Sequence, residues 1–86
     1  MKTVEQKFST GDPIDNYNAV AYAEGFAGNK ETTMADELTA WAHLIRTGMC
    51  WSLQGWFGRT ASSLIERGMI TPEGDISWEV VDELLD

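Results

Sequence analysis

The sequence predicts an all-α protein, a compact bundle of about four short helices, with or without one small β-hairpin before the last helix. Three observations predict this fold class. Apolar residues recur at the helical spacing of three and four positions in several separate segments. Capping residues precede these segments, and glycines follow several of them. The length of 86 residues corresponds to a single domain with a thin core.

We therefore expect one domain over residues 1–86. Residues 1–11 are expected to be flexible or loosely packed, and residues 72–86 to form an acidic C-terminal segment. The chain holds four tryptophans, which is many for its length. Because truncation of a buried tryptophan costs about 3 to 5 kcal/mol, any tryptophan in the core is close to essential.

The first predicted helix follows Asp12-Pro13. Asp12 suits the N-cap position, Pro13 suits the first helical position, and Asp15 places negative charge beside the free amides of the first turn. Gly25 is expected to end this helix, and residues 28–30 to form a turn. The expected apolar face comprises Ile14, Tyr17 and Ala21, with Val20 at its margin.

The second predicted helix has the clearest boundaries. Thr33 is expected to cap its first turn, and Gly48 is expected to end it. His43 falls on the face opposite Trp41, so we expect a solvated histidine and not a catalytic one. The expected apolar stripe comprises Leu38, Trp41, Leu44 and Ile45.

The third predicted helix has two alternative starts. Ser52 as its N-cap would place Gly55 and Gly58 inside the helix. Alternatively, residues 53–58 form a compact loop that leads into a helix beginning near Arg59. In both alternatives Gly68 ends the helix. Both also share one apolar face, which comprises Phe57, Ala61, Leu64 and Ile65.

A tight turn and a final helix complete the predicted fold. The segment Thr71-Pro72-Glu73-Gly74 has proline at the second position and glycine at the fourth position of a type I turn. Ile70 and Ile76 flank this turn and are placed to pair briefly as strands. Ser77 is the expected N-cap of the last helix. The apolar residues expected to line up on that helix are Trp78, Val81 and Leu85.

One strip of the third predicted helix carries glycines, which are unfavourable inside a helix. In the helical alternative, Gly55, Gly58 and Ser62 share a narrow strip, although each interior glycine costs about 1 kcal/mol relative to alanine. Packing explains the glycines if they lie in a loop with positive φ or at a tight crossing against the helix that carries Trp41. The alternative is that a partner or a ligand approaches this backbone closely. Arg59 lies beside the strip, and arginine near free amides suits an anion or a carboxylate. The candidate binding residues are Gln54, Gly55, Trp56, Gly58, Arg59 and Ser62.

The composition argues against several classes of function. The formal net charge is −8, and the last sixteen residues carry six acids and no base, which disfavours binding to nucleic acid. Cys50 has no second cysteine to pair with, and one histidine with one cysteine cannot make a zinc site. The sequence has no apolar run of the about 18 residues needed for a membrane span, and residues 2–8 lack the hydrophobic core of a signal peptide, so we expect a protein that is neither inserted nor exported. We expect a cytoplasmic protein without metal, cofactor or membrane contact. With no phosphate loop and no paired histidine and nucleophile, we expect no catalysis.

The central segment resembles a known family. The run Trp51-Ser52-Leu53-Gln54-Gly55-Trp56-Phe57-Gly58-Arg59-Thr60-Ala61, followed by Leu64-Ile65 and Gly68, is similar to the W-x-L-Q-G-x-[YF]-G-R-x-A-x-x-L-I signature of an uncharacterised family of small tailed-bacteriophage proteins. The run Leu44-Ile45-Arg46-Thr47-Gly48 matches the upstream half of the pattern. The resemblance covers residues 21–70 and implies a phage-encoded accessory protein that acts in the cytoplasm of an infected host cell. The chain departs from the pattern in having two aromatic residues, Trp56 and Phe57, where one is typical, and a longer acidic C-terminal extension.

Two classes of function are consistent with these observations. The first is non-catalytic binding to a protein, either a host or phage protein or a second copy of the chain, because tryptophan and arginine are typical interface anchors. Inhibition of a host defence or nucleic-acid enzyme is one form of it, and the acidic C-terminal segment would then imitate phosphates. The alternative is a compact winged-helix-like nucleic-acid-binding or regulatory protein, with residues 59–67 in a groove and residues 71–74 as the wing.

Overall fold

The computed structural model describes residues 7–8, 11–24 and 33–85. Within these residues the chain forms five helices, and pairing between extended segments is limited to two isolated bridges. The all-α fold class is confirmed. The helices are α1 (Asn16–Ala23), α2 (Met34–Thr47), α3 (Met49–Ser52), α4 (Gly55–Glu66) and α5 (Trp78–Leu85).

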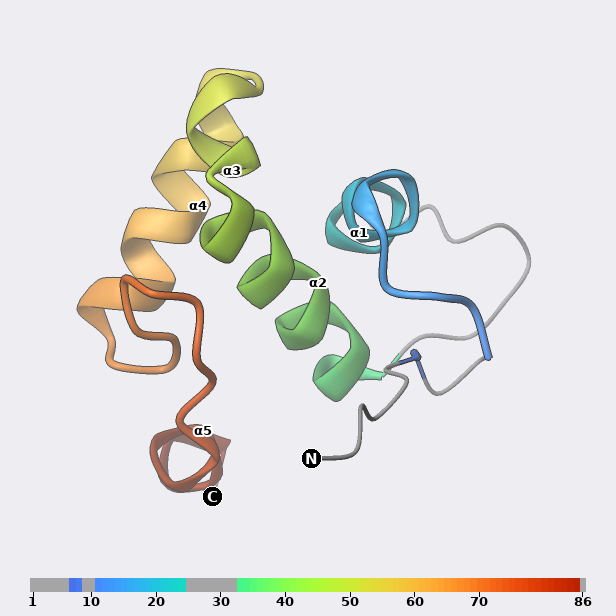
Figure 1. Cartoon of the computed structure of the whole chain (residues 1–86). Coiled ribbons are helices and arrows are strands. Elements are labelled where there is room, and N and C mark those ends of the chain that lie inside the picture. Colours follow the sequence, from blue (N-terminus) through green and yellow to red (C-terminus); the bar gives the residue numbers. More distant parts are fainter. Residues whose placement is uncertain (1–6, 9–10, 25–32, 86) are drawn as a thin grey trace, which may run out of the picture.

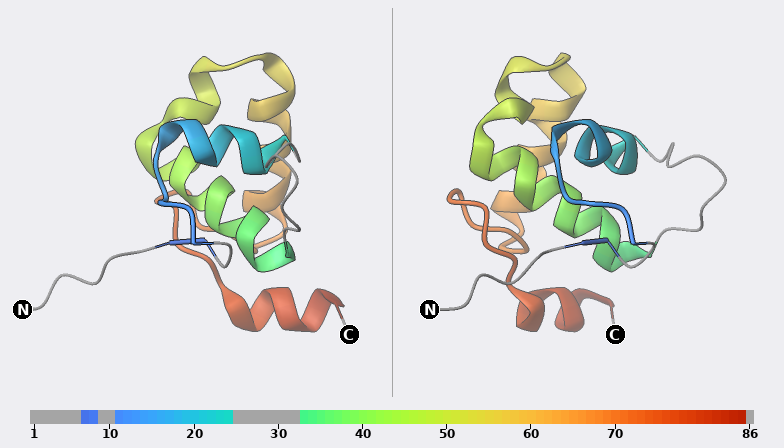
Figure 2. Two further views of the ribbon diagram at one scale, coloured as in Figure 1. Left: turned by 90° about the vertical axis from the view of Figure 1, so that its right-hand side faces the viewer. Right: turned by 45° about the vertical axis from the view of Figure 1, so that its right-hand side comes forward.

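The helix α2 lies in the middle of the structure. Figure 1 shows α1 on one side of α2, and α3 and α4 on the other side. Figure 2 shows that α5 lies below the other four helices, near the N-terminal end of α2. None of the helices in the described part of the chain is long and apolar enough to cross a lipid bilayer.

The predicted boundaries of α2 are confirmed. Thr33 is the N-cap and forms a capping box with Asp36: the Asp36 amide donates to Thr33 Oγ1 at 3.1 Å, and the Asp36 carboxylate accepts from the Thr33 amide. Gly48 ends the helix with a φ of 82°, a left-handed conformation that glycine adopts without steric cost. The entire predicted apolar stripe of α2 is buried.

An aromatic cluster joins α2 to α4. The Trp41 ring of α2 meets the Trp56 ring edge-on at a centroid distance of 5.9 Å and lies 5.8 Å from the Phe57 ring. Trp56 and Phe57 stack on each other at 4.2 Å. As predicted, Phe57 and Ala61 are buried, and Leu64 and Ile65 pack against the core.

The first helix differs from its prediction at its start and in its buried face. It begins at Asn16, because the Asp15 carboxylate accepts the hydrogen bond from the Asn18 amide at 2.8 Å and so acts as the N-cap in place of Asp12. Pro13 lies before the helix, bridged to Lys7. The predicted helix end at Gly25 and the predicted turn at residues 28–30 lie outside the described residues.

The buried side of α1 is formed by Ala19 and Tyr22, whereas Tyr17, which was expected on that side, is 81% exposed. Contacts with Phe8 and Asp12 hold Tyr22. Its ring stacks on Phe8 at 3.8 Å, and its hydroxyl donates to the Asp12 carboxylate at 2.9 Å. Phe8 is 3% exposed, so this residue of the segment 1–11 is part of the core.

Neither predicted start of the third helix is correct. Directly after Gly48 the chain forms the four-residue helix α3, which ends at Ser52. Leu53 and Gln54 separate it from α4, which begins at Gly55 with Gln54 at the N-cap position. Both glycines of the strip therefore lie inside a helix, and the residue expected to cap that helix belongs to the preceding one.

The connection between α4 and α5 follows its prediction. The Gly74 amide donates to the Thr71 carbonyl at 2.9 Å, which closes the turn, and Ile70 and Ile76 form an isolated antiparallel bridge. Helix α5 begins directly after Ser77 and buries Val81. Trp78, however, is 47% exposed, and the side chain of Leu85 lies outside the description.

Gly74 makes the closest approach between this turn and α2. Its φ is +94°, and an added Cβ would lie 2.7 Å from Arg46 Cβ and 2.8 Å from the Ala42 carbonyl oxygen. Real Cβ atoms do not come so close to backbone atoms, so only glycine fits without movement of the turn.

We predict that Gly74→Ala lowers the free energy of unfolding by about 2 to 4 kcal/mol, from left-handed backbone strain together with overpacking. Gly11→Ala is the matched control, because Gly11 has a φ of +95° but nothing within 4 Å of an added Cβ. The control should lose only about 1 to 2 kcal/mol. Urea denaturation measures both values, and equal losses would contradict the close packing of Gly74 on α2.

Candidate functional site

The predicted binding strip is a solvent-facing surface of α4 in the structure. Gly55, Arg59 and Ser62 are exposed, and Gly58 is half-buried. Trp51, from α3, lies beside Gly58: an added Cβ on Gly58 would be 3.7 Å from Trp51 Cε3. We call Trp51, Gly55, Gly58, Arg59 and Ser62 the Trp51 face.

The fold does not require glycine in this face. Neither Gly55 nor Gly58 has a positive φ. A Cβ on Gly58 would make ordinary van der Waals contacts, and a Cβ on Gly55 would meet only the movable end of Arg59, at 3.1 Å from Nη1. Nor does Gly58 lie at a tight crossing against Trp41, since the atoms nearest to its Cβ position belong to Trp51 and Cys50. Packing within the described chain therefore leaves the two glycines unexplained.

Trp51 and Arg59 are the two large side chains of the Trp51 face. The indole of Trp51 is 52% exposed while its Cε3 edge rests on α4, so the ring is supported but not enclosed. The Arg59 guanidinium folds back toward Gly55 and has no ion pair or hydrogen bond to any side chain in the described part of the chain. Both side chains are available to a partner.

The other two predicted site residues lie differently. Gln54 is exposed at the N-cap of α4 and makes no side-chain capping bond. Trp56 is half-buried, and its ring contacts Trp41 and Phe57. The structure thus places Gln54 at the edge of the Trp51 face and Trp56 in the aromatic cluster.

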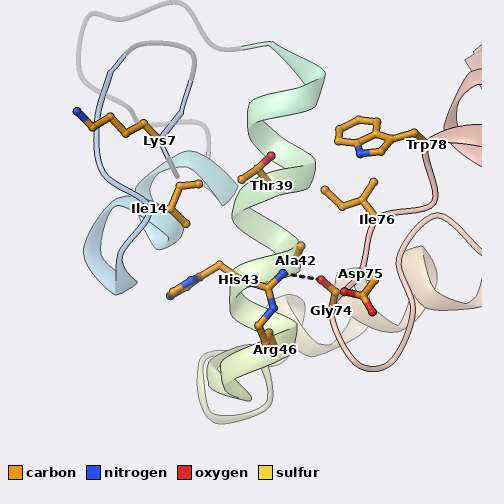
Figure 3. Close-up of a pocket in the computed structure, with 10 residues that line it drawn as sticks. All are labelled: Lys7, Ile14, Thr39, Ala42, His43, Arg46, Gly74, Asp75, Ile76 and Trp78. Atoms are coloured by element: carbon orange, nitrogen blue, oxygen red, sulfur yellow. Dashed lines mark hydrogen bonds between the residues drawn. The ribbon is translucent and has the colours of Figure 1, made fainter. Parts of the chain in front are cut away.

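A hollow that the sequence did not indicate lies along α2. It has a volume of about 430 Å³, and Figure 3 shows the ten residues that line it. Its floor is the part of α2 that carries Thr39, Ala42, His43 and Arg46, and its walls come from the segment before α1 and from residues 74–78. We call this hollow the α2 groove.

Hydrogen bonds hold two of the polar side chains of the α2 groove, Arg46 and His43. Arg46 Nη2 donates to the Gly74 carbonyl at 3.0 Å, which ties the guanidinium to the turn. His43 Nε2 donates to Asn16 Oδ1 at 2.8 Å, which ties α2 to the start of α1. His43 is half-buried, and its bond to Asn16 lies at the surface, so the side chain is partly solvated as its position on the helical wheel indicated.

Burial lowers the pKa of His43, and the positive charge of Arg46 lowers it further, whereas Asp15 acts weakly in the opposite direction. The imidazole is accordingly neutral near pH 7. Burial also raises the pKa of the Cys50 thiol, which is completely enclosed. No group of three or more metal-ligating side chains occurs among the described residues.

Sequence reasoning did not place Trp51 and Arg46 in a site. For Trp51, the available signal was Gly48, three residues before it. A glycine in that position can end one helix and let the next helix begin directly after it. For the α2 groove, the available signal was the spacing of Thr39, Ala42, His43 and Arg46, which lie on one face of a helix. The walls come from distant segments, which no spacing rule locates.

The chain belongs to the family described as a domain of unknown function (DUF7417), which matches residues 20–85. No curated protein and no solved structure matches it. The matched region includes α2, α3, α4 and α5, and therefore the whole Trp51 face.

We predict that Gly58→Ala leaves the free energy of unfolding unchanged or raises it by up to about 1 kcal/mol, because alanine favours the helix and its Cβ has room. Urea denaturation of the variant and the parent chain measures the difference. A loss of stability as large as about 1 kcal/mol would show that the fold itself requires this glycine.

We also predict that stability falls as the pH is lowered from about 7 to about 5. Because the pKa of His43 is lower in the folded than in the unfolded chain, the unfolded state binds the proton first. The stabilisation is complete above the unfolded value of about 6.5 and is lost as the pH falls through the folded-state pKa. In urea denaturation at several pH values, His43→Gln should flatten this slope. An unchanged slope would contradict the assignment.

Proposed function

We propose that this chain is a small, acidic, phage-encoded accessory protein without catalytic activity, which binds a host or phage protein through the Trp51 face in the cytoplasm of the infected cell. The observation that supports the proposal most is that Gly58 lies inside a helix that has room for alanine there, and that alanine at Gly55 would displace only the movable end of Arg59. The phage origin is supported by the resemblance of residues 51–68 to the phage signature.

Gly58 lowers the stability of α4. A glycine in a helix interior costs up to about 1 kcal/mol relative to alanine, and the described contacts of Gly58 offer no compensation. Gly55 is the first residue of α4, where the cost is smaller. A glycine leaves the helix backbone open to close approach, which serves a partner and not the isolated fold. The face around Gly58 is then a contact surface.

The side chains that border the glycines have the chemistry of an interface. Tryptophan and arginine are the residues that most often dominate binding energy at protein interfaces. Trp51 offers a supported, half-exposed ring, so little conformational entropy is lost when a partner covers it. Arg59 has free donors, which suit a carboxylate or backbone carbonyls of the partner.

Charge supports a protein partner over nucleic acid. Arg59 is the only basic side chain of the Trp51 face, and the formal net charge of the chain is −8. Phosphate backbones are bound by clusters of basic residues, which this face does not provide. A host defence or nucleic-acid enzyme remains the kind of protein partner that we propose.

The proposal predicts that Trp51→Ala and Arg59→Ala each weaken capture of a protein partner about 30-fold, the loss typical of an interface hot spot. The tagged chain is used to capture proteins from a nuclease-treated lysate of infected host cells. Trp78→Ala and Arg67→Ala are the matched controls, because Trp78 is 47% exposed on α5 and Arg67 is exposed at the end of α4. Both should retain capture.

Gly58→Ala adds a separate test, since it should weaken capture without loss of stability. Circular dichroism confirms that each variant is folded. The proposal fails if the parent chain captures no protein, or if the Trp51 and control variants capture the same protein equally. Capture that nuclease treatment abolishes would support the winged-helix-like alternative instead.

A further inference from the structure

We propose that the α2 groove binds a small organic monoanion, a carboxylate carried on an apolar or aromatic body. This site is separate from the Trp51 face and does not depend on the function proposed for it. The inference rests on the size of the groove, on the position of one arginine, and on the apolar side chains that face it.

The dimensions of the α2 groove suit a small molecule. Its volume of about 430 Å³ lies in the range of about 300 to 1,000 Å³ that is usual for ligand pockets. The floor is continuous helix surface, and Figure 3 shows that the two walls stand on opposite sides of α2. A ligand can therefore lie along α2 between the walls.

Arg46 supplies the anion-binding group. Its bond to the Gly74 carbonyl uses one of the five donors of the guanidinium and holds the group in place before any ligand arrives. It has no ion pair with a carboxylate in the described part of the chain. An arginine that is already positioned and still has free donors binds a carboxylate with little loss of entropy.

The remaining charges limit the ligand to one negative charge. Asp75 also lines the α2 groove and would repel a dianion, and the His43 side chain is neutral. Lys7 lines the groove too, but Figure 3 shows its amine directed away from Arg46 and Trp78. A monovalent carboxylate therefore fits better than a phosphate dianion.

The apolar side chains face the other part of the groove. Ile14 stands on one wall, and Ile76 and Trp78 stand on the other. The Trp78 indole is 47% exposed, so it offers a ring against which an aromatic or aliphatic body can pack. Thr39 lies on the floor between the walls, and its small side chain leaves space there for a ligand.

The test is a titration of the isotope-labelled full chain with 3-phenylpropanoate, followed by amide chemical shifts. We expect saturable shifts in residues 39–46 and 74–78. The neutral 3-phenylpropanamide and inorganic phosphate should each bind at least about tenfold more weakly, because one lacks the charge and the other lacks the apolar body.

Arg46→Gln should weaken the binding of 3-phenylpropanoate about tenfold, while Arg67→Gln, an exposed arginine elsewhere, should leave it unchanged. Since Arg46→Gln also removes the bond to Gly74, Thr39→Leu is the second variant. It fills the floor of the groove, leaves Arg46 intact, and should abolish binding in a folded chain.

Three results would overturn the proposal: no saturable binding of 3-phenylpropanoate, equal binding by the two arginine variants, or unchanged binding by Thr39→Leu. Phosphate that binds as tightly as 3-phenylpropanoate would also overturn it, because the apolar walls would then contribute nothing.

Discussion

The structure depends on the burial of α2 on most of its sides. Trp41 packs against the aromatic residues of α4, and on other sides α2 is covered by α1 and by the turn that carries Gly74. Ala40 and Ala42 are buried, and the Ala42 carbonyl oxygen lies next to Gly74. Because burial of a large apolar side chain stabilises a fold by about 1.5 to 3 kcal/mol, rotation of α2 would expose several such contacts together.

This central position of α2 also determines where the two candidate binding surfaces lie. The left-handed turn at Gly48 leads the chain directly from α2 into α3, which places Trp51 against α4. The close approach of Gly74 places the 74–78 segment beside Arg46 and so makes one wall of the α2 groove. Each surface is supported by the packing of α2, so the exposure of Trp51 and Trp78 does not reflect a loose fold.

Local chemistry explains which features could be predicted from the sequence. Thr33 and Gly48 correctly predicted the two ends of α2, because caps act through neighbouring backbone groups that the sequence itself specifies. The start of α1 could not be fixed in this way, since Asp12 and Asp15 are both good caps and the contact of Tyr22 with Asp12 decides between them. For the candidate site, the sequence located the glycine strip and its arginine. It could not show that the strip has room for alanine, nor that Gly74 has none, because both facts depend on atoms from other elements.

The other parts of the fold pack on α2, and native-state hydrogen exchange measures how much they depend on it. We expect the amides around Trp41 and Leu44 to exchange only through global unfolding, with a free energy equal to that from urea denaturation. The amides of α5 should exchange through smaller openings, because α5 lies below the other helices and leaves Trp78 half-exposed. Exchange of the α2 amides that is as fast as, or faster than, exchange in α5 would show that the fold does not depend on α2.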